Sequence, residues 1–161
     1  MSDTNLIDKV KSNFSDAVIE THNFRGDQTV TVKKESVSEI IKFLRDDPDL
    51  AFNFLMDITA VDYLERKPVR YEVVYHLYSL QFNYRIRIKA PVAEEDCKID
   101  TVVPLYKTAN WYEREIWDMY GIKFNDHPNM TRILLYEGFK GHPLRKDYPI
   151  NKRQPLIGPM N

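Results

Sequence analysis

The sequence predicts an α+β domain in two layers: a largely antiparallel sheet with helices on one of its faces, followed by an extended C-terminal tail. Two neighbouring segments alternate apolar and polar residues, which is typical of strands with one solvated face. Other segments repeat apolar residues with helical spacing. The composition changes at Gly121, because nine of the last 41 residues are proline or glycine, against five of the first 120. We therefore expect a domain over residues 1–120 and a tail over residues 121–161.

The expected elements of the domain follow the order helix, strand, strand, helix, strand, strand, strand, helix. An apolar stripe from Leu6 to Phe14 predicts the first helix, and a stripe from Val37 to Leu44 predicts the second. Strands are expected at 17–21, at 29–33, within 51–61, at 70–78 and at 82–89. The short connection between the last two strands favours an antiparallel hairpin, and the whole order favours helices gathered on one sheet face.

The last helix is expected over residues 104–120, after an acidic loop at 91–100. Asn110 followed by Glu113 resembles a capping box, in which the glutamate would bond back to the start of the helix. Arg114 and Asp118 lie four positions apart and are expected to pair on the helix surface. Gly121 stands where a helix stop belongs.

The chain has 161 residues, 43% of them hydrophobic and 29% charged, which is the composition of an ordinary globular domain. This excludes a disordered chain, a collagen and a coiled coil. The net charge of −1 argues against nucleic-acid binding. Cys97 is the single cysteine, so the chain forms no internal disulfide and builds no zinc or iron–sulfur site from several thiolates of its own.

No apolar run approaches the roughly 20 residues that a membrane helix needs. Residues 1–14 lack the apolar core of a signal peptide. We therefore expect a soluble chain made in the cytoplasm, which meets a membrane only through its partners.

The tail combines positive charge with apolar residues. It carries seven basic and three acidic residues, a net charge of +4, so that residues 1–120 carry −5. Its prolines exclude a long helix, yet it is richer in apolar residues than a disordered linker. The tail can either wrap its own domain or lie along a partner. Its length, charge and prolines favour the partner, since loops of this length are uncommon inside compact domains.

Three features invite a catalytic or metal-binding interpretation, and each has a simpler one. No nucleophile or metal motif accompanies the charge cluster at 113–118, which we interpret as a solvated or partner-facing helix surface. His127 and His142 each precede a proline and lack metal-ligand spacing, so we expect them to hold an extended tail by hydrogen bonds. Cys97 follows three acidic residues, which raise the pKa of a thiol and disfavour catalysis.

One strand has a basic face. Arg85, Arg87 and Lys89 alternate along the segment at 82–89, and two tyrosines lie nearby. Such a face is compatible with RNA binding on a sheet, but Glu72 and the acidic loop oppose it. We expect no nucleic-acid partner.

Two long motifs carry a resemblance to a known family. They read EREIWDMYG at 113–121 and GHPLRKDYP at 141–149, with supporting stretches MDITAVDY at 56–63, YEVVYHLYSL at 71–80, RIRIKAPV at 85–92 and QPLIGP at 154–159. The region resembles the thirty-kilodalton subunit, also named the C subunit, of respiratory complex I, the proton-pumping NADH:quinone oxidoreductase. The family usually has a glycine where this chain has Asp126 and a basic residue where it has Thr131.

The resemblance implies a non-redox subunit of the hydrophilic arm that docks on the quinone-site subunit, also named the D subunit, and on neighbouring subunits. It implies no catalytic residue, cofactor or metal in this chain, because FMN and the iron–sulfur clusters belong to partner subunits. The complex transfers electrons from NADH through those groups to quinone, coupled to proton translocation. The resemblance also implies a peripheral place on the cytoplasmic side of the inner (cell) membrane.

Within that frame, we expect the last helix and the tail to form the partner interface. The arginine and lysine side chains would meet acidic or carbonyl groups, and the aromatic side chains would act as anchors. The charges at 113–118 would fix the junction between helix and tail. The expected interface residues are Trp111, Glu113, Arg114, Glu115, Trp117, Asp118, His127, Arg132, His142, Arg145, Lys146, Asp147 and Tyr148.

Two alternatives remain open from the sequence. Related subunits serve complexes that accept electrons from ferredoxin or belong to the membrane-bound hydrogenase type, and this chain does not report the electron donor. A chain of a different class would be a small hydrolase that uses His127 or His142 with a carboxylate. Its mark would be activity of the isolated chain that is lost on His142→Ala without loss of folding.

Overall fold

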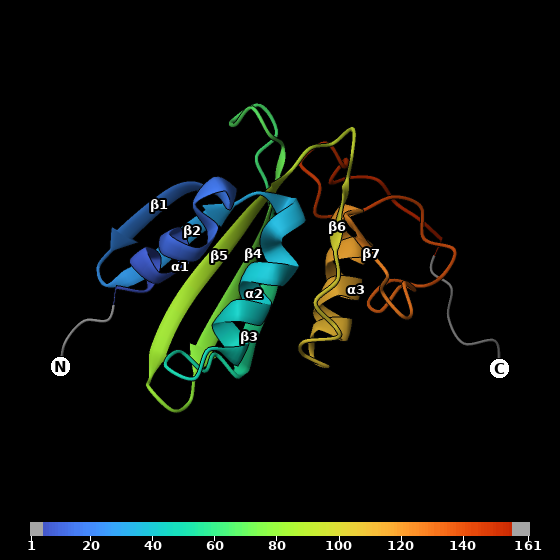
Figure 1. The fold of residues 1–161 in the computed structure, drawn as a ribbon. Helices are drawn as coiled ribbons and strands as arrows, with labels where there is room; N and C mark the ends of the chain where they lie inside the picture. Colours follow the sequence, from blue (N-terminus) through green and yellow to red (C-terminus); the bar gives the residue numbers. More distant parts are fainter. Residues whose placement is uncertain (1–4, 156–161) are drawn as a thin grey trace.

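The computed structural model describes residues 5–155, and its elements follow the predicted order with two short strands added (Figure 1). The helices are α1 (Leu6–Phe14), α2 (Val37–Asp46) and α3 (Ala109–Tyr120), and single turns of 3-10 helix precede β1 and α2. The strands are β1 (Val18–Phe24), β2 (Asp27–Val32), β3 (Phe54–Asp62), β4 (Tyr71–Ser79), β5 (Tyr84–Val92), β6 (Lys98–Asp100) and β7 (Lys123–Asn125). The predicted α+β class is confirmed.

Five strands form one sheet in the spatial order β1-β2-β5-β4-β3. Neighbouring strands are antiparallel except β2 and β5, which run parallel. The predicted hairpin of the two clearest strands is confirmed, with Tyr75 of β4 opposite Ile88 of β5. The parallel pair brings the first hairpin beside the second, so the sheet is mixed but mostly antiparallel.

The helices α1 and α2 cover one face of this sheet (Figure 1). On that face Val30, Ile88 and Tyr75 lie side by side across three strands, and all are fully buried. The neighbouring positions of the same strands, Arg87 and His76, point to the opposite face because side chains alternate along a strand. The predicted alternation is present along β5, whereas in the first half of β4 Glu72 and Val74 on the opposite face are buried as well.

Helix α3 packs beside β3 and extends the core. The hydroxyl of Tyr112 donates to the carbonyl of Met56 at 3.1 Å, and the hydroxyl of Tyr106 donates to the carbonyl of Phe52. On either side of α3 in the sequence, β6 and β7 pair in parallel as a second, two-stranded sheet. The segment at 91–100, expected as a loop, contains the end of β5 and all of β6. The prediction missed β6 because three residues are too few to display an alternation.

The start of α3 differs from the prediction. The helix begins at Ala109, and Thr108 at its N-cap makes no side-chain bond to the helix. The expected capping box of Asn110 and Glu113 is wrong, because the Glu113 carboxylate accepts hydrogen bonds from the segment that follows β6.

Beyond β7 the tail forms no further helix or strand up to Pro155. It lies over the C-terminal end of α3 and the adjacent end of the large sheet (Figure 1). The described part of the tail thus wraps its own domain, which is the alternative that the sequence favoured less. The family-like stretch at 154–159 lies mostly outside the described residues. No helix within residues 5–155 is long and apolar enough to cross a membrane.

Candidate partner interface at helix α3 and the tail

The tail satisfies the last carbonyl groups of α3. The helix ends at Gly121, whose φ of 81° is left-handed and whose N–H bonds to the Trp117 carbonyl at 2.8 Å. The last carbonyls of a helix have no partner within it, and here three of them bond to the tail. The pairs are Asp118 O with His142 Nδ1 at 3.0 Å, Met119 O with Leu144 N at 3.1 Å, and Tyr120 O with Arg145 Nε at 2.6 Å.

The Asp118 carboxylate anchors a second stretch of the tail. Its Oδ2 accepts the backbone N–H groups of residues 133, 134 and 135 at 3.2, 2.9 and 2.9 Å, and its Oδ1 pairs with Arg132. Burial would raise the pKa of Asp118, but these hydrogen bonds hold it below its usual value. The expected pair of Arg114 with Asp118 is wrong, because Arg114 bonds to the carbonyl and hydroxyl of Thr131 instead.

Arg132 links several parts of the tail to α3. Its Nη2 donates to the Phe139 carbonyl at 2.8 Å, while its guanidinium lies 5.5 Å from the ring centre of Trp117 and 5.8 Å from that of Phe139. Trp117 is half-buried and also meets the His142 ring edge-on at 6.4 Å. The guanidinium of Arg132 therefore donates its hydrogen bonds to acceptors of its own chain.

A separate ionic cluster joins the tail to the large sheet through Arg70, which is only 8% exposed. Its guanidinium donates to both oxygens of Asp62 at 3.1 and 2.9 Å, to Glu94 at 2.6 Å and to Asp147 at 2.7 Å. The backbone N–H of Lys146 adds a bond to Asp62 at 2.8 Å. We call these five residues the Arg70 cluster.

The charges of the Arg70 cluster reinforce one another. Hydrogen bonds to Asp62 and then Asp147 raise the pKa of Arg70, so the guanidinium stays charged. The hydrogen bond from Arg70 lowers the pKa of Asp147. Burial would raise the pKa of Asp62, but hydrogen bonds from Arg70 and from backbone N–H groups outweigh burial and lower it. One guanidinium is therefore shared by three carboxylates, and its hydrogen bonds favour the ionised forms of Asp62 and Asp147.

Glu113 lies in the core and ties the start of α3 to the preceding segment. It is fully buried, and its carboxylate accepts from the Thr101 hydroxyl and from the Val102 N–H, the latter at 2.8 Å. Burial raises the pKa of Glu113 to about 7, although both hydrogen bonds favour its ionised form. Nε2 of His127 lies 3.9 Å from Oε2 of Glu113.

The two tail histidines are held as neutral rings. Nδ1 of His127 accepts the N–H of Asn129 at 3.0 Å, so Nε2 carries the proton and donates to the Asn110 carbonyl at 3.1 Å. Nδ1 of His142 faces a carbonyl and is therefore the protonated nitrogen. Burial lowers the pKa of both. Their expected role in holding the tail is confirmed, and no group of three potential metal ligands occurs within residues 5–155.

The outer side of α3 and the tail forms an open, mainly apolar groove of about 730 Å³. Trp111 and Leu134 dominate it and are 70% and 62% exposed. Its lining includes one charge of each sign, Lys107 and Glu115. We call this the Trp111–Leu134 groove; its lining is Lys107, Thr108, Trp111, Tyr112, Glu115, Ile133 and Leu134.

Comparison with known families decides the identity of the chain. Residues 30–154 match the family described as the 30 Kd subunit of respiratory-chain NADH dehydrogenase. The chain belongs to this 30 Kd subunit family. The match contains the Arg70 cluster, α3 and the tail as far as Gln154, so the geometry above is the geometry of a family member.

Similar members of the 30 Kd subunit family come from several bacteria. The chain is 51% identical over 152 residues to the NADH-quinone oxidoreductase C subunit of Citrifermentans bemidjiense, covering 93% of this chain and 92% of that one. It is 47% identical over 161 residues to the protein of the same name from Geobacter metallireducens, covering 98% of each. The resemblance to the 30 Kd subunit family that the sequence motifs indicated is therefore confirmed.

Two solved structures share the fold. A fragment of Nqo5, described as the trypsin-resistant fragment (1-134), has a TM-score of 0.68 and 30% identity, covering 77% of this chain and 96% of that one. A chain of the membrane-bound sulfane sulfur reductase, an archaeal respiratory membrane complex, has a TM-score of 0.72 and 22% identity, covering 90% of this chain and 86% of that one. The second likeness concerns the fold alone.

The structure explains the two departures from the family pattern. Asp126 has a φ of +57°, a left-handed conformation that glycine adopts freely and aspartate tolerates better than most residues. Thr131 supplies its carbonyl and hydroxyl to Arg114 at 3.0 and 3.1 Å.

The expected interface residues divide into two groups. Glu113, Asp118 and Arg132 are bonded within the chain and are at most slightly exposed, whereas Trp111 and Glu115 lie in the open groove. Arg114, His127, His142, Arg145 and Asp147 also bond within the chain, each with a partner described above, although the Asp147 side chain is about half exposed. Of the remaining residues, Trp117 packs with Arg132, Lys146 contributes its backbone, and Tyr148 stacks on Phe139 with its hydroxyl accepting from Gln154.

Sequence reasoning missed three members of the Arg70 cluster: Arg70, Asp62 and Glu94. One signal was available for Asp62, which shares the inward register of Ile58 and Ala60 along β3 and is 4% exposed. A charged residue on the apolar face of a strand requires a buried partner.

Proposed function

We propose that this chain is a non-redox structural subunit that docks on the quinone-site subunit of NADH-quinone oxidoreductase through the Trp111–Leu134 groove. In this proposal the complex carries electrons from NADH through FMN and iron–sulfur clusters to quinone, coupled to proton translocation. Those cofactors belong to partner subunits. The chain would sit peripherally on the cytoplasmic side of the inner membrane.

The observation that carries the proposal is the groove itself. Large aromatic and aliphatic side chains at the centre of a depression, with charges at the rim, are typical of protein interfaces. Within residues 5–155, Trp111 is the most exposed tryptophan or tyrosine on which a partner could anchor, at 70% exposure. The tail beneath it is held by Asp118 and by the Arg70 cluster, so the groove is formed before a partner binds.

Two further observations support a structural rather than a redox role. The sequence has one cysteine, Cys97, whose pKa is raised mainly by burial, so it neither ligates a cluster with other thiolates nor acts as a reactive thiolate. The Nqo5 fragment that shares the fold is described as trypsin-resistant, as expected of a compact folded unit.

The test uses the tagged chain in its native membranes, with Trp111→Ala combined with Leu134→Ser. We expect co-purification of the quinone-site subunit and NADH:quinone reductase activity in the eluate to fall at least tenfold, since each truncation of a central anchor costs roughly 1–2 kcal/mol of binding. Phe24→Ser is the matched control, because Phe24 is 64% exposed on β1, outside the groove. Normal co-purification of the double variant would refute docking through the groove. Recovery of the same partners without NADH oxidation would refute NADH as the electron donor.

A further inference from the structure

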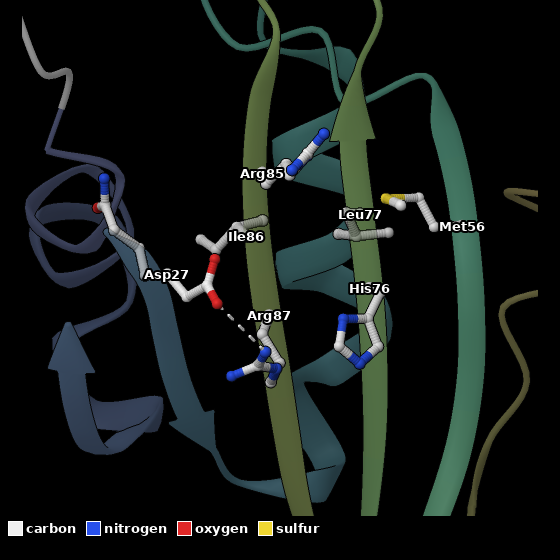
Figure 2. A pocket seen from close by; sticks show the side chains of 8 residues that line it. Asp27, Met56, His76, Leu77, Arg85, Ile86 and Arg87 are labelled. Atoms are coloured by element: carbon white, nitrogen blue, oxygen red, sulfur yellow. Dashed lines mark ion pairs between the residues drawn. The ribbon is translucent and has the colours of Figure 1, made fainter. Parts of the chain in front are cut away.

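The open face of the large sheet, opposite α1 and α2, carries a shallow hollow of about 100 Å³ near the hairpin that joins β4 to β5. Figure 2 looks onto this face and shows side chains from β2, β5, β4 and β3 gathered there. We call the surface formed by Met56, His76, Tyr78, Arg85 and Arg87 the hairpin face. No helix of the described chain covers it (Figure 1).

The cations of the hairpin face have few anionic partners. Arg87 donates to the Thr29 hydroxyl at 3.2 Å, and its other terminal nitrogen lies 3.9 Å from Asp27. Arg85 lies 5.5 Å from the ring centre of Tyr78, and within residues 5–155 no carboxylate forms an ion pair with it. Arg85 is exposed, so its planar set of N–H donors remains available to a carboxylate.

The other end of the same sheet face is closed by contrast. Glu72 is 5% exposed and pairs with Lys67 at 3.1 Å and with Lys89 at 2.9 Å. The third cation of β5, Lys89, is therefore neutralised within the chain, while Arg85 is not. Residues 1–120 carry a net charge of −5, so acidic side chains outnumber basic ones there. Arg85 nevertheless has no carboxylate partner among the residues that the structure describes.

Apolar side chains border this arginine. Met56 on β3 lines the hollow and is 43% exposed, and Phe54, 45% exposed, lies in the same row as Tyr78 and Arg85. Arginine, methionine and aromatic residues together are the composition that protein interfaces enrich. A nucleic acid would need cations along the path of its backbone, whereas Asp57 lies in the row of His76 and Arg87, and Asp27 lines the hollow.

We propose that the hairpin face receives a carboxylate-bearing segment of a neighbouring subunit, with the Arg85 guanidinium as its ion-pair donor and Met56 and Phe54 as its apolar wall. The chain then has a contact surface additional to the Trp111–Leu134 groove. The inference rests on assembly in a complex, and it does not depend on which partner fills the groove.

The first test replaces the guanidinium by an amine. In the purified complex that contains Arg85→Lys, a carbodiimide should couple the amine at position 85 to an aspartate or glutamate of another subunit, and mass spectrometry would identify the cross-linked peptides. The unsubstituted complex is the control, since arginine does not react. Absence of any cross-link from position 85 to another subunit would overturn the proposal. Nucleic acid co-purifying with the chain and lost on Arg85→Glu would overturn it in favour of RNA.

The second test reverses the charge. Arg85→Glu should weaken retention of the cross-linked subunit roughly tenfold during a salt wash. Lys42→Glu makes the same change on the exposed side of α2 and should leave retention unaltered. Equal retention in both variants would refute the ion pair. If the groove variant assembles normally while the cross-link at position 85 forms, docking through the groove fails and the hairpin face stands. If instead the groove variant fails to assemble and no cross-link forms at position 85, docking through the groove stands and the hairpin face is refuted.

Discussion

The Asp147 carboxylate lies 2.7 Å from Nη2 of Arg70, although 77 positions separate the two residues in the chain. This contact closes the tail onto the large sheet, because Arg70 directly precedes β4 and Asp147 follows the segment that caps α3. The neighbouring N–H of Lys146 bonds to Asp62, so backbone and side chain of the tail meet the same cluster. Stability of the domain and placement of the tail are therefore coupled at one guanidinium.

Arg70→Ala should destabilise the chain strongly. The substitution leaves three carboxylates without their shared cation, and one of them, Asp62, is buried. Removing one partner of a buried pair costs roughly 3–5 kcal/mol of unfolding free energy. Urea unfolding measures the loss, with Arg66→Ala as the control, since Arg66 is exposed in the loop before β4. A loss no larger than that of the control would show that the cluster does not hold the tail.

Asp118→Asn should loosen the tail more than the domain. The amide keeps the size of the side chain but loses the charge that Arg132 and the N–H groups of residues 133–135 share. Hydrogen bonds to charged groups contribute about 1.5–3 kcal/mol, so those amides should exchange about tenfold to a hundredfold faster. Hydrogen-exchange mass spectrometry measures this. Glu115→Gln, an exposed change on the same helix, should have no effect, and equal protection in Asp118→Asn would contradict the anchoring role.

Glu113 should make the stability of the chain depend on pH. Its pKa rises from an ordinary 4.5 to about 7 on folding, so the folded state binds more protons than the unfolded state between these values. The contribution of Glu113 is fully present below about pH 4.5 and is lost as the pH rises through about 7. Across that window, the unfolding free energy of the wild type should fall relative to Glu113→Gln by roughly 2–3 kcal/mol.

The buried histidines act in the opposite direction. The pKa values of His127 and His142 are lowered, so their contributions are present above about pH 6.5 and are lost as the pH falls. Comparing Glu113→Gln with the wild type cancels this shared effect, and urea unfolding between about pH 5 and pH 8 gives the difference. If the difference in unfolding free energy between the wild type and Glu113→Gln does not change with pH, the pKa of Glu113 is not raised on folding.

Gly121→Ala should displace the tail from the end of α3. A Cβ at this position would lie 2.7 Å from Cδ2 of His142 and 2.9 Å from Nη2 of Arg145, in addition to the strain of a positive φ. The matched control is Gly26→Ala, where φ is also positive but no atom lies within 4 Å of the added carbon. We expect about 1 kcal/mol of destabilisation in the control and at least about twice that at Gly121. Faster tryptic cleavage of the tail should accompany Gly121→Ala alone.

Much of the fold could be predicted from one-dimensional patterns. The alternation at 82–89 and the stripe from Val37 to Leu44 each indicate which side chains are buried, and burial fixes the type of element. Alternation does not specify which strand lies beside which. The parallel pairing of β2 with β5 and of β6 with β7 therefore could not be predicted, since it depends on the path of the chain between strands.

The candidate site was harder to predict for a related reason. The resemblance marked most tail residues, and Trp111 does lie in an open groove. The partners of Arg70, however, lie 8, 24 and 77 positions away, and no local spacing rule connects them. Arg132 and Asp118 were marked as residues that meet a partner or fix a junction, yet only the folded tail shows that they bind each other.

The capping of α3 by the tail also bears on how the chain is made. During translation, α3 is synthesised before His142 and Arg145, which bond to its last carbonyls. A nascent chain that ends between them exposes bare helix carbonyls and a buried arginine without one of its carboxylates. Truncated products would thus display unsatisfied polar groups that chaperones and proteases can engage, and completed chains would hide them. These polar groups are therefore satisfied only after synthesis has passed Asp147.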